Sequence, residues 1–164
     1  MRAVAIELDR VLGDTRPLWN GWLEEAARRY SSIAQLDLSS LPRDRGAAAE
    51  ELDRWAQQGI GDWRRALERY AEDHASLHLR PDPEVGAALR ALIERGVAVG
   101  VFTDGPEALA RVALAHLGAL RRVEYLETGK GALDRLLARL GPETTVVRAR
   151  DQLTTKRATG RSRY

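Results

Sequence analysis

Cysteine is absent from the 164 residues of this chain, which excludes a disulfide framework, a thiol nucleophile and a thiolate metal site. Long hydrophobic runs are missing too, because no apolar stretch approaches the roughly 20 residues that a membrane-spanning helix needs. The amino terminus lacks the extended apolar segment of a signal peptide, and its few apolar residues already belong to a predicted strand. These absences lead us to expect a cytoplasmic protein that does not contact a membrane.

Lysine is scarce, since arginine outnumbers it 24 to 2. The formal net charge is +2 at pH 7, but residues 1–147 hold 20 basic and 23 acidic side chains, whereas residues 148–164 hold six basic and one acidic. Clustered basic residues can bind a phosphate backbone, but no aromatic side chain is interleaved with residues 156–163. We therefore predict that residues 157–164 form a basic, solvated and disordered tail, and that nucleic acid is not the partner.

Apolar residues recur at helical spacing in the first half of the chain. They predict helices over residues 16–31, about 46–58 and about 62–77, with a polar segment at 36–45 after the first. The tryptophans all fall in this part of the chain (Trp19, Trp22, Trp55, Trp63). Their spacing favours a helical unit with its own core, but exposed tryptophans could instead anchor a protein partner or a homodimer.

From residue 84 onward the pattern alternates between helix and strand. After a first strand at Ala3-Val4-Ala5-Ile6, the apolar runs predict strands at 97–102, 123–126 and 144–147 and helices from 84 to Gly96, at 107–117 and at 131–140. This order predicts a three-layer α/β fold with a parallel sheet of about four strands and crossover helices. We assign residues 1–15 and 84–156 to this core and residues 16–83 to an inserted, all-helical cap.

Residues that could bind a ligand or take part in catalysis follow each predicted strand, at the edge where parallel α/β sheets bind their ligands. Glu7 and Asp9 are two residues apart and so point to the same side of the first strand. The later strand ends supply Thr103-Asp104-Gly105, then Gly129-Lys130, then Arg150-Asp151 and Lys156. Carboxylates, a hydroxyl, helix amino termini and an ammonium group at one edge suit a phosphate with a cation. Lys130 is either a point charge placed there for that purpose or an ordinary surface lysine.

These segments resemble, in order, the four motifs of the haloacid dehalogenase superfamily, most of whose members are phosphatases. The first motif of that family, Asp-x-Asp-Gly-Thr/Val-Leu, corresponds here to Glu7-Leu8-Asp9-Arg10-Val11-Leu12. The second corresponds to Thr103-Asp104-Gly105, the third to Gly129-Lys130, and the fourth to the region of Arg150-Asp151. The resemblance covers nearly the whole chain, including a helical cap inserted after the first strand.

The resemblance implies a role for each matching position. Position 7 would attack phosphorus, and Asp9 would act as general acid and base. Thr103 and the loop at Asp104 and Gly105 would hold the phosphoryl oxygens, and Lys130 would screen the charge of nucleophile and phosphate. Glu7, Asp9 and Asp151 would be the ligands of a magnesium ion.

Four positions depart from the family pattern. Glu7 is one methylene longer than the usual aspartate, Arg10 and Arg150 replace glycines, and Lys156 stands where an acid is usual. Arg10 could reach into the phosphate position, and magnesium would bind weakly or not at all. We expect a phosphatase-like protein with weakened or lost phosphoryl transfer that binds a phosphorylated small molecule or a partner. The alternatives are an active magnesium-dependent phosphomonoester hydrolase and an interaction module acting through the tryptophan-rich cap.

Overall fold

The computed structural model describes residues 1–34 and 36–154, with no side-chain description for residues 33 and 34. The predicted tail and Lys156 lie outside the described residues. Four strands form one parallel sheet in the order β3-β2-β1-β4: β1 (Ala3–Glu7), β2 (Ala98–Thr103), β3 (Tyr125–Thr128) and β4 (Thr144–Val147). The predicted α/β fold class is therefore confirmed.

The two central strands bring the first two motifs side by side. Residues 3–6 of β1 are all buried, as the continuous apolar run predicts for a strand covered on both faces. In the register of the sheet, Glu7 pairs with Phe102, and Thr103 pairs with Thr128 of β3. Glu7 and Thr103 therefore end neighbouring strands at the same edge of the sheet.

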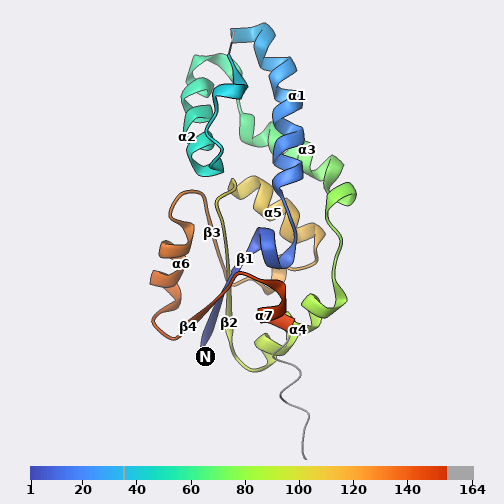
Figure 1. Cartoon of the computed structure of the whole chain (residues 1–164), viewed down its shortest axis with the longest axis vertical. Helices are drawn as coiled ribbons and strands as arrows, with labels where there is room; N and C mark the ends of the chain where they lie inside the picture. The colour runs from blue at the N-terminus through green and yellow to red at the C-terminus, as the bar shows by residue number, and fades with distance from the viewer. Residues whose placement is uncertain (35, 155–164) are drawn as a thin grey trace, which may run out of the picture.

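Helices cover both faces of the sheet (Figure 1). On one face α6 (Ala132–Leu140) packs against Ala5 and Phe102. Its approach depends on Gly100, because a Cβ atom there would come within 2.6 Å of Leu136 Cδ1. The other face is covered by α4 (Pro83–Glu94) and α5 (Glu107–His116), whose apolar residues join Val4 and Val101 in the main core.

The insert between β1 and α4 is entirely helical and stands beyond one end of the sheet (Figure 1). It contains α1 (Arg16–Ala34), the short turn η2 (Leu38–Ser40), α2 (Arg45–Trp55), the turn η3 (Ala56–Ile60) and α3 (Trp63–His78). The four tryptophans are buried, and Trp19, Trp22 and Trp63 lie with ring centroids 5.5 to 6.5 Å apart. These aromatic side chains form part of a core that runs without interruption from the insert to the sheet.

Two local differences from the predicted elements have clear physical causes. The third strand begins two residues later than predicted, because the turn η4 (Leu120–Arg122) and Val123 precede it. A short helix, α7 (Arg150–Thr154), occupies a segment predicted as loop. The Gln152 side chain accepts hydrogen bonds from the backbone N–H groups of Arg148 and Ala149, which stabilises this turn. No helix in residues 1–34 or 36–154 is both long and apolar enough to span a bilayer.

Candidate functional site

Asp9 is held rigidly in the turn that follows β1. This turn, η1 (Leu8–Leu12), is anchored by the buried side chains of Leu8, Val11 and Leu12. Asp9 Oδ1 accepts hydrogen bonds from the backbone N–H of Thr15 at 2.8 Å and from its hydroxyl at 2.5 Å. Asp9 Oδ2 accepts a hydrogen bond from the Thr103 hydroxyl at 3.1 Å. The first two motifs are thus joined through this carboxylate.

An arginine from the insert completes the surroundings of Asp9. Arg45 is the first residue of α2, and its side chain is only 4% exposed. Its Nη2 lies 2.5 Å from Asp9 Oδ2 and 2.7 Å from Asp104 Oδ1, and its Nη1 donates to the Thr15 hydroxyl at 2.7 Å. The guanidinium therefore bridges two carboxylates that come from different strand ends.

The charges of this bridge shift the pKa values of two of its members. Partial burial alone would raise the pKa of Asp104, but hydrogen bonds and charge attraction from Arg45 outweigh burial and leave that pKa lowered. Burial alone would lower the pKa of Arg45, but its hydrogen bonds to Asp104 and the charge of Asp9 leave the pKa raised. Both groups are therefore charged at neutral pH.

Sequence reasoning missed Arg45 because position 45 ended a segment predicted as polar linker. Two neighbours carried a weak signal. Asp44 caps α2 by accepting a hydrogen bond from the N–H of Ala47 at 2.8 Å. Gly46 is unfavourable within a helix, but a Cβ atom there would come within 2.7 Å of the backbone nitrogen of Lys130. A capping Asp followed closely by glycine thus marks the point where the insert approaches the core.

Glu7 has a different cationic neighbour. Its side chain is 20% exposed, and Oε2 is buried without a hydrogen bond among the described residues. Nη1 of Arg148, which follows β4, lies 3.9 Å from this oxygen, and the Arg148 guanidinium lies over the ring of Phe102. Glu7 and Asp9 therefore lie at the same strand end, but each faces its own arginine.

The remaining predicted phosphate-site residues lie near this end of the sheet. Thr103 is buried, and its hydroxyl also accepts a hydrogen bond from the N–H of Gly105 at 3.2 Å. A Cβ atom on Gly105 would come within 3.0 Å of Arg45 Nη1, so this glycine leaves room for the guanidinium. Lys130 is exposed, and its backbone adjoins the start of α2. Arg10 is exposed and lines the cleft described below.

The predicted metal ligands are not gathered in this arrangement. Asp151 lies exposed in the first turn of α7, and its Oδ1 accepts a hydrogen bond from the N–H of Gln152 at 2.9 Å. Arg150 forms an ion pair with Asp82 of the segment before α4. Within the described ranges, no three acidic or histidine side chains form a group suited to a metal ion. The acids present therefore do not fit a magnesium ion here, because Arg45 engages Asp9 and the Asp151 carboxylate is hydrogen-bonded within α7.

A cleft of about 510 Å³ opens between the strand ends and the insert. Its polar lining includes Glu7, Asp9, Asp104 and four arginines (Arg10, Arg16, Arg43, Arg45). Its apolar wall comes from the insert (Trp19, Leu23, Leu38, Leu41, Pro42). The cleft can therefore accept a small molecule that has both an anionic group and an apolar part.

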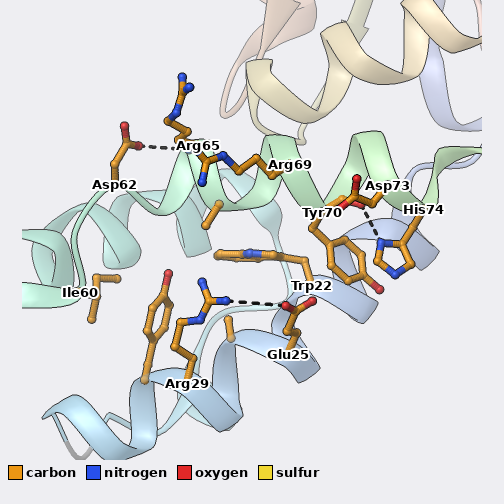
Figure 2. A pocket seen from close by; sticks show the side chains of 13 residues that line it. Trp22, Glu25, Arg29, Ile60, Asp62, Arg65, Arg69, Tyr70, Asp73 and His74 are labelled. Atoms are coloured by element: carbon orange, nitrogen blue, oxygen red, sulfur yellow. Dashed lines mark hydrogen bonds and ion pairs between the residues drawn. The ribbon is translucent and has the colours of Figure 1, made fainter.

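Another cavity, of about 460 Å³, lies within the insert between α1 and α3 and contains none of the predicted site residues. Figure 2 shows Trp22 lying across it, with the Arg29 side chain directed toward Glu25. Its lining includes three arginines (Arg29, Arg65, Arg69) and three acids (Glu25, Asp62, Asp73). This balance of charge gives the cavity no preference for an anion.

Comparisons with known proteins agree with the architecture. No family model matches the chain. A phosphoglycolate phosphatase from Neisseria meningitidis is 28% identical over 72% of this chain, which spans about half (54%) of the length of that curated relative. Among solved structures, an HAD phosphatase from Thermococcus onnurineus superposes with a TM-score of 0.53 at 18% identity, covering 89% of this chain and 76% of that one. A putative beta-phosphoglucomutase from Thermotoga maritima gives a TM-score of 0.54 at 20% identity, covering 89% and 75%.

The parallel sheet, the helical insert after β1 and these structural relatives define an α/β protein with the haloacid dehalogenase-like fold. The chain is therefore similar in fold to the haloacid dehalogenase-like hydrolases, and in sequence to a phosphatase. The resemblance predicted from its motifs is therefore confirmed.

Proposed function

We propose that this chain keeps the architecture of a phosphatase but transfers phosphoryl groups weakly or not at all, and that it binds a phosphorylated small molecule in the cleft beside Glu7. The observation that carries the proposal is that hydrogen-bond donors already fill the acceptor positions of the Asp9 carboxylate. A carboxylate has about four acceptor positions. Asp9 fills them with the N–H and hydroxyl of Thr15, the Thr103 hydroxyl and the Arg45 guanidinium.

This occupation removes the general acid and base that the family resemblance implies. To accept a proton, Asp9 would have to give up at least one of its four hydrogen bonds. Giving up Arg45 would leave a guanidinium that is 4% exposed without its nearest carboxylate. The closed arrangement therefore opposes proton transfer at Asp9.

The length of Glu7 opposes the chemical step independently. Its extra methylene displaces the carboxylate by roughly 1 Å from the place of an aspartate, and such an error can lower a rate about a hundredfold. Among the residues that the structure describes, Oε2 has no hydrogen-bond donor to orient it, and the cation that it faces, Arg148 Nη1, is 3.9 Å away. Glu7 is therefore a poorly positioned nucleophile.

Ligand binding is supported by the charges at the mouth of the cleft. Arg10 and Arg43 are exposed there, and neither forms an ion pair with another described residue. Arg16, by contrast, is paired in two-point fashion with Asp14 at 2.8 Å. Arg10 and Arg43 are thus available to a phosphate group, while the wall formed by Trp19 and its apolar neighbours can contact the rest of the ligand.

Hydrolysis of p-nitrophenyl phosphate with magnesium tests the loss of activity. We expect background turnover by the wild type and by the control Glu94→Asp, which shortens an exposed glutamate of α4. The double variant Glu7→Asp/Arg45→Gln should exceed them, because it restores the shorter carboxylate and frees Asp9. Magnesium-dependent turnover by the wild type that equals or exceeds that of the double variant would contradict the proposal.

Calorimetric titration with inorganic phosphate tests the binding. Arg10→Ala and Arg43→Ala should each weaken phosphate binding several-fold, whereas Arg95→Ala, an exposed arginine after α4, should not. Equal affinity in all four proteins would show that phosphate does not bind at this cleft.

An active phosphomonoester hydrolase is the second candidate, because the curated relative is a phosphoglycolate phosphatase. Its activity would require Arg45 to leave Asp9 when ligand binds. The assay above separates the two candidates through the wild-type rate. The third alternative, an interaction module, loses its aromatic anchors because the tryptophans are buried; a homodimer through the cap stays a prediction.

A further inference from the structure

A deeply buried cation lies in the seam between the insert and the sheet. Arg45 comes from the insert, while its partners Asp9, Thr103 and Asp104 belong to the ends of two strands. Asp9 is 10% exposed and Asp104 is 46% exposed. Two carboxylates that converge on one point repel each other unless a cation lies between them, and Arg45 supplies that cation.

We propose that Arg45 is the resident cation of this site, and that it takes the place between Asp9 and Asp104 that a divalent metal ion would otherwise occupy. The guanidinium reaches both carboxylates from Nη2 and also binds the Thr15 hydroxyl through Nη1. A metal ion at the same carboxylates would need the lone pairs that these bonds already use. The contact of Arg45 with Asp9 and Asp104 and the binding of a metal ion to the same two carboxylates therefore exclude each other.

The surrounding structure is shaped to keep Arg45 in place. Gly105 leaves the space that the guanidinium fills, since a side chain there would lie 3.0 Å from Nη1. Gly46, the next residue, allows α2 to approach the backbone of Lys130. Asp44 fixes the start of α2 by capping it. These contacts position Arg45 from both sides of the seam, as expected for a permanent counterion.

Arg45 and a divalent metal ion should each oppose the binding of the other to the acid pair. If Arg45 and a divalent ion compete for Asp9 and Asp104, removing Arg45 releases the acid pair and increases its affinity for a metal ion. The wild type, in contrast, should gain no stability from the metal. This expectation does not depend on whether the protein turns over phosphate esters.

Two measurements test the proposal. Electron paramagnetic resonance of the free ion measures the affinity for Mn²⁺, and thermal unfolding measures the melting temperature at increasing Mn²⁺ concentration. The proteins are the full-length wild type, Arg45→Ala and the control Arg95→Ala, which removes an exposed arginine that follows α4 and does not line the cleft. We expect Arg45→Ala to bind Mn²⁺ at least about tenfold more tightly than the other two, and to be the only protein that Mn²⁺ stabilises. Equal binding by wild type and Arg45→Ala, or no binding by either, would overturn the proposal.

Arg45→Lys covers the case in which Arg45→Ala does not fold without metal. A lysine keeps the charge but cannot bridge two carboxylates in the manner of a guanidinium. Folding of Arg45→Ala only with Mn²⁺, or tighter Mn²⁺ binding by Arg45→Lys than by wild type, supports the proposal. If Arg45→Ala folds under neither condition, wild-type-like binding by Arg45→Lys overturns it. Wild-type turnover, together with tighter Mn²⁺ binding by Arg45→Ala, would overturn the proposed function alone. Wild-type Mn²⁺ binding as tight as that of Arg45→Ala, without turnover, would overturn this inference alone.

Discussion

Two helical glycines should respond in opposite directions to the same substitution. Gly46 lies in the first turn of α2, and Gly86 lies in the first turn of α4. Replacing a helical glycine with alanine contributes up to about 1 kcal/mol, because alanine loses less conformational freedom on folding. Both sites share this local gain. Any difference in the change of stability between the two variants therefore reflects the contacts that the new methyl group makes.

The surroundings of the two glycines differ sharply. At Gly86 the nearest atom to a new Cβ is Nη1 of Arg90 at 3.6 Å, an ordinary contact with a flexible and exposed side chain. At Gly46 the nearest atom is the backbone nitrogen of Lys130 at 2.7 Å, which cannot move without moving the loop. Overpacking of this kind costs about 1–3 kcal/mol, which outweighs the gain in helix propensity.

Thermal unfolding followed by circular dichroism measures the result. For a chain of this size, 1 kcal/mol corresponds to roughly 2–4 °C. We therefore expect Gly86→Ala to raise the melting temperature by about 2–4 °C and Gly46→Ala to lower it by a similar amount or more. A Gly46→Ala protein as stable as Gly86→Ala would refute the close approach of α2 to the core, and with it the geometry that places Arg45 on Asp9.

The other predictions concern packing in the core and the loss of stability at acidic pH. Trp63 is 1% exposed and its indole N–H donates to Asp53 at 2.9 Å, so Trp63→Ala should lower the free energy of unfolding by about 3–5 kcal/mol in urea titrations, and Trp63→Phe by clearly less; equal losses would contradict the packing. Leu136→Ala empties the core under α6 and should cost about 2–5 kcal/mol in the same assay. Because Arg45 lowers the pKa of Asp104 in the folded state, the stability from this group is present above the ordinary aspartate pKa of about 3.8 and is lost as pH falls through the lower folded pKa. The melting temperature of Asp104→Asn should therefore decrease less steeply than that of the wild type below about pH 4. The same decrease in both proteins would argue against the ion pair between Arg45 and Asp104.

Most of the fold could be predicted because apolar periodicity is a local signal. The helices and strands of the core and the insert lie within about two or three residues of their predicted bounds, as with α5, predicted at 107–117 and observed at Glu107–His116. One exception is α7, whose five residues are too few to show a period. Its start depends on the Gln152 side chain, a single contact that composition does not reveal.

Within the candidate site, the residues placed by the sheet could be predicted and those placed by packing could not. Parallel strands bring their carboxyl ends together, so Glu7, Asp9 and Thr103 follow from topology. Arg45 depends on how the insert lies against the sheet, and Arg148 depends on the order of β1 and β4. With 24 arginines in the chain, neither arginine stands out in the sequence.

The positions of these arginines change which part of the cleft attracts an anion. Around the strand ends, and within residues 1–34 and 36–154, three carboxylates (Glu7, Asp9, Asp104) form ion pairs with two arginines, Arg45 and Arg148. This inner region therefore carries an excess of negative charge and repels a phosphate, whereas Arg10 and Arg43 at the mouth attract one. If the proposed function holds, the phosphate of a ligand in this cleft should lie at Arg10 and Arg43 and not against the Glu7 carboxylate, so the charges that favour binding should also disfavour attack on phosphorus.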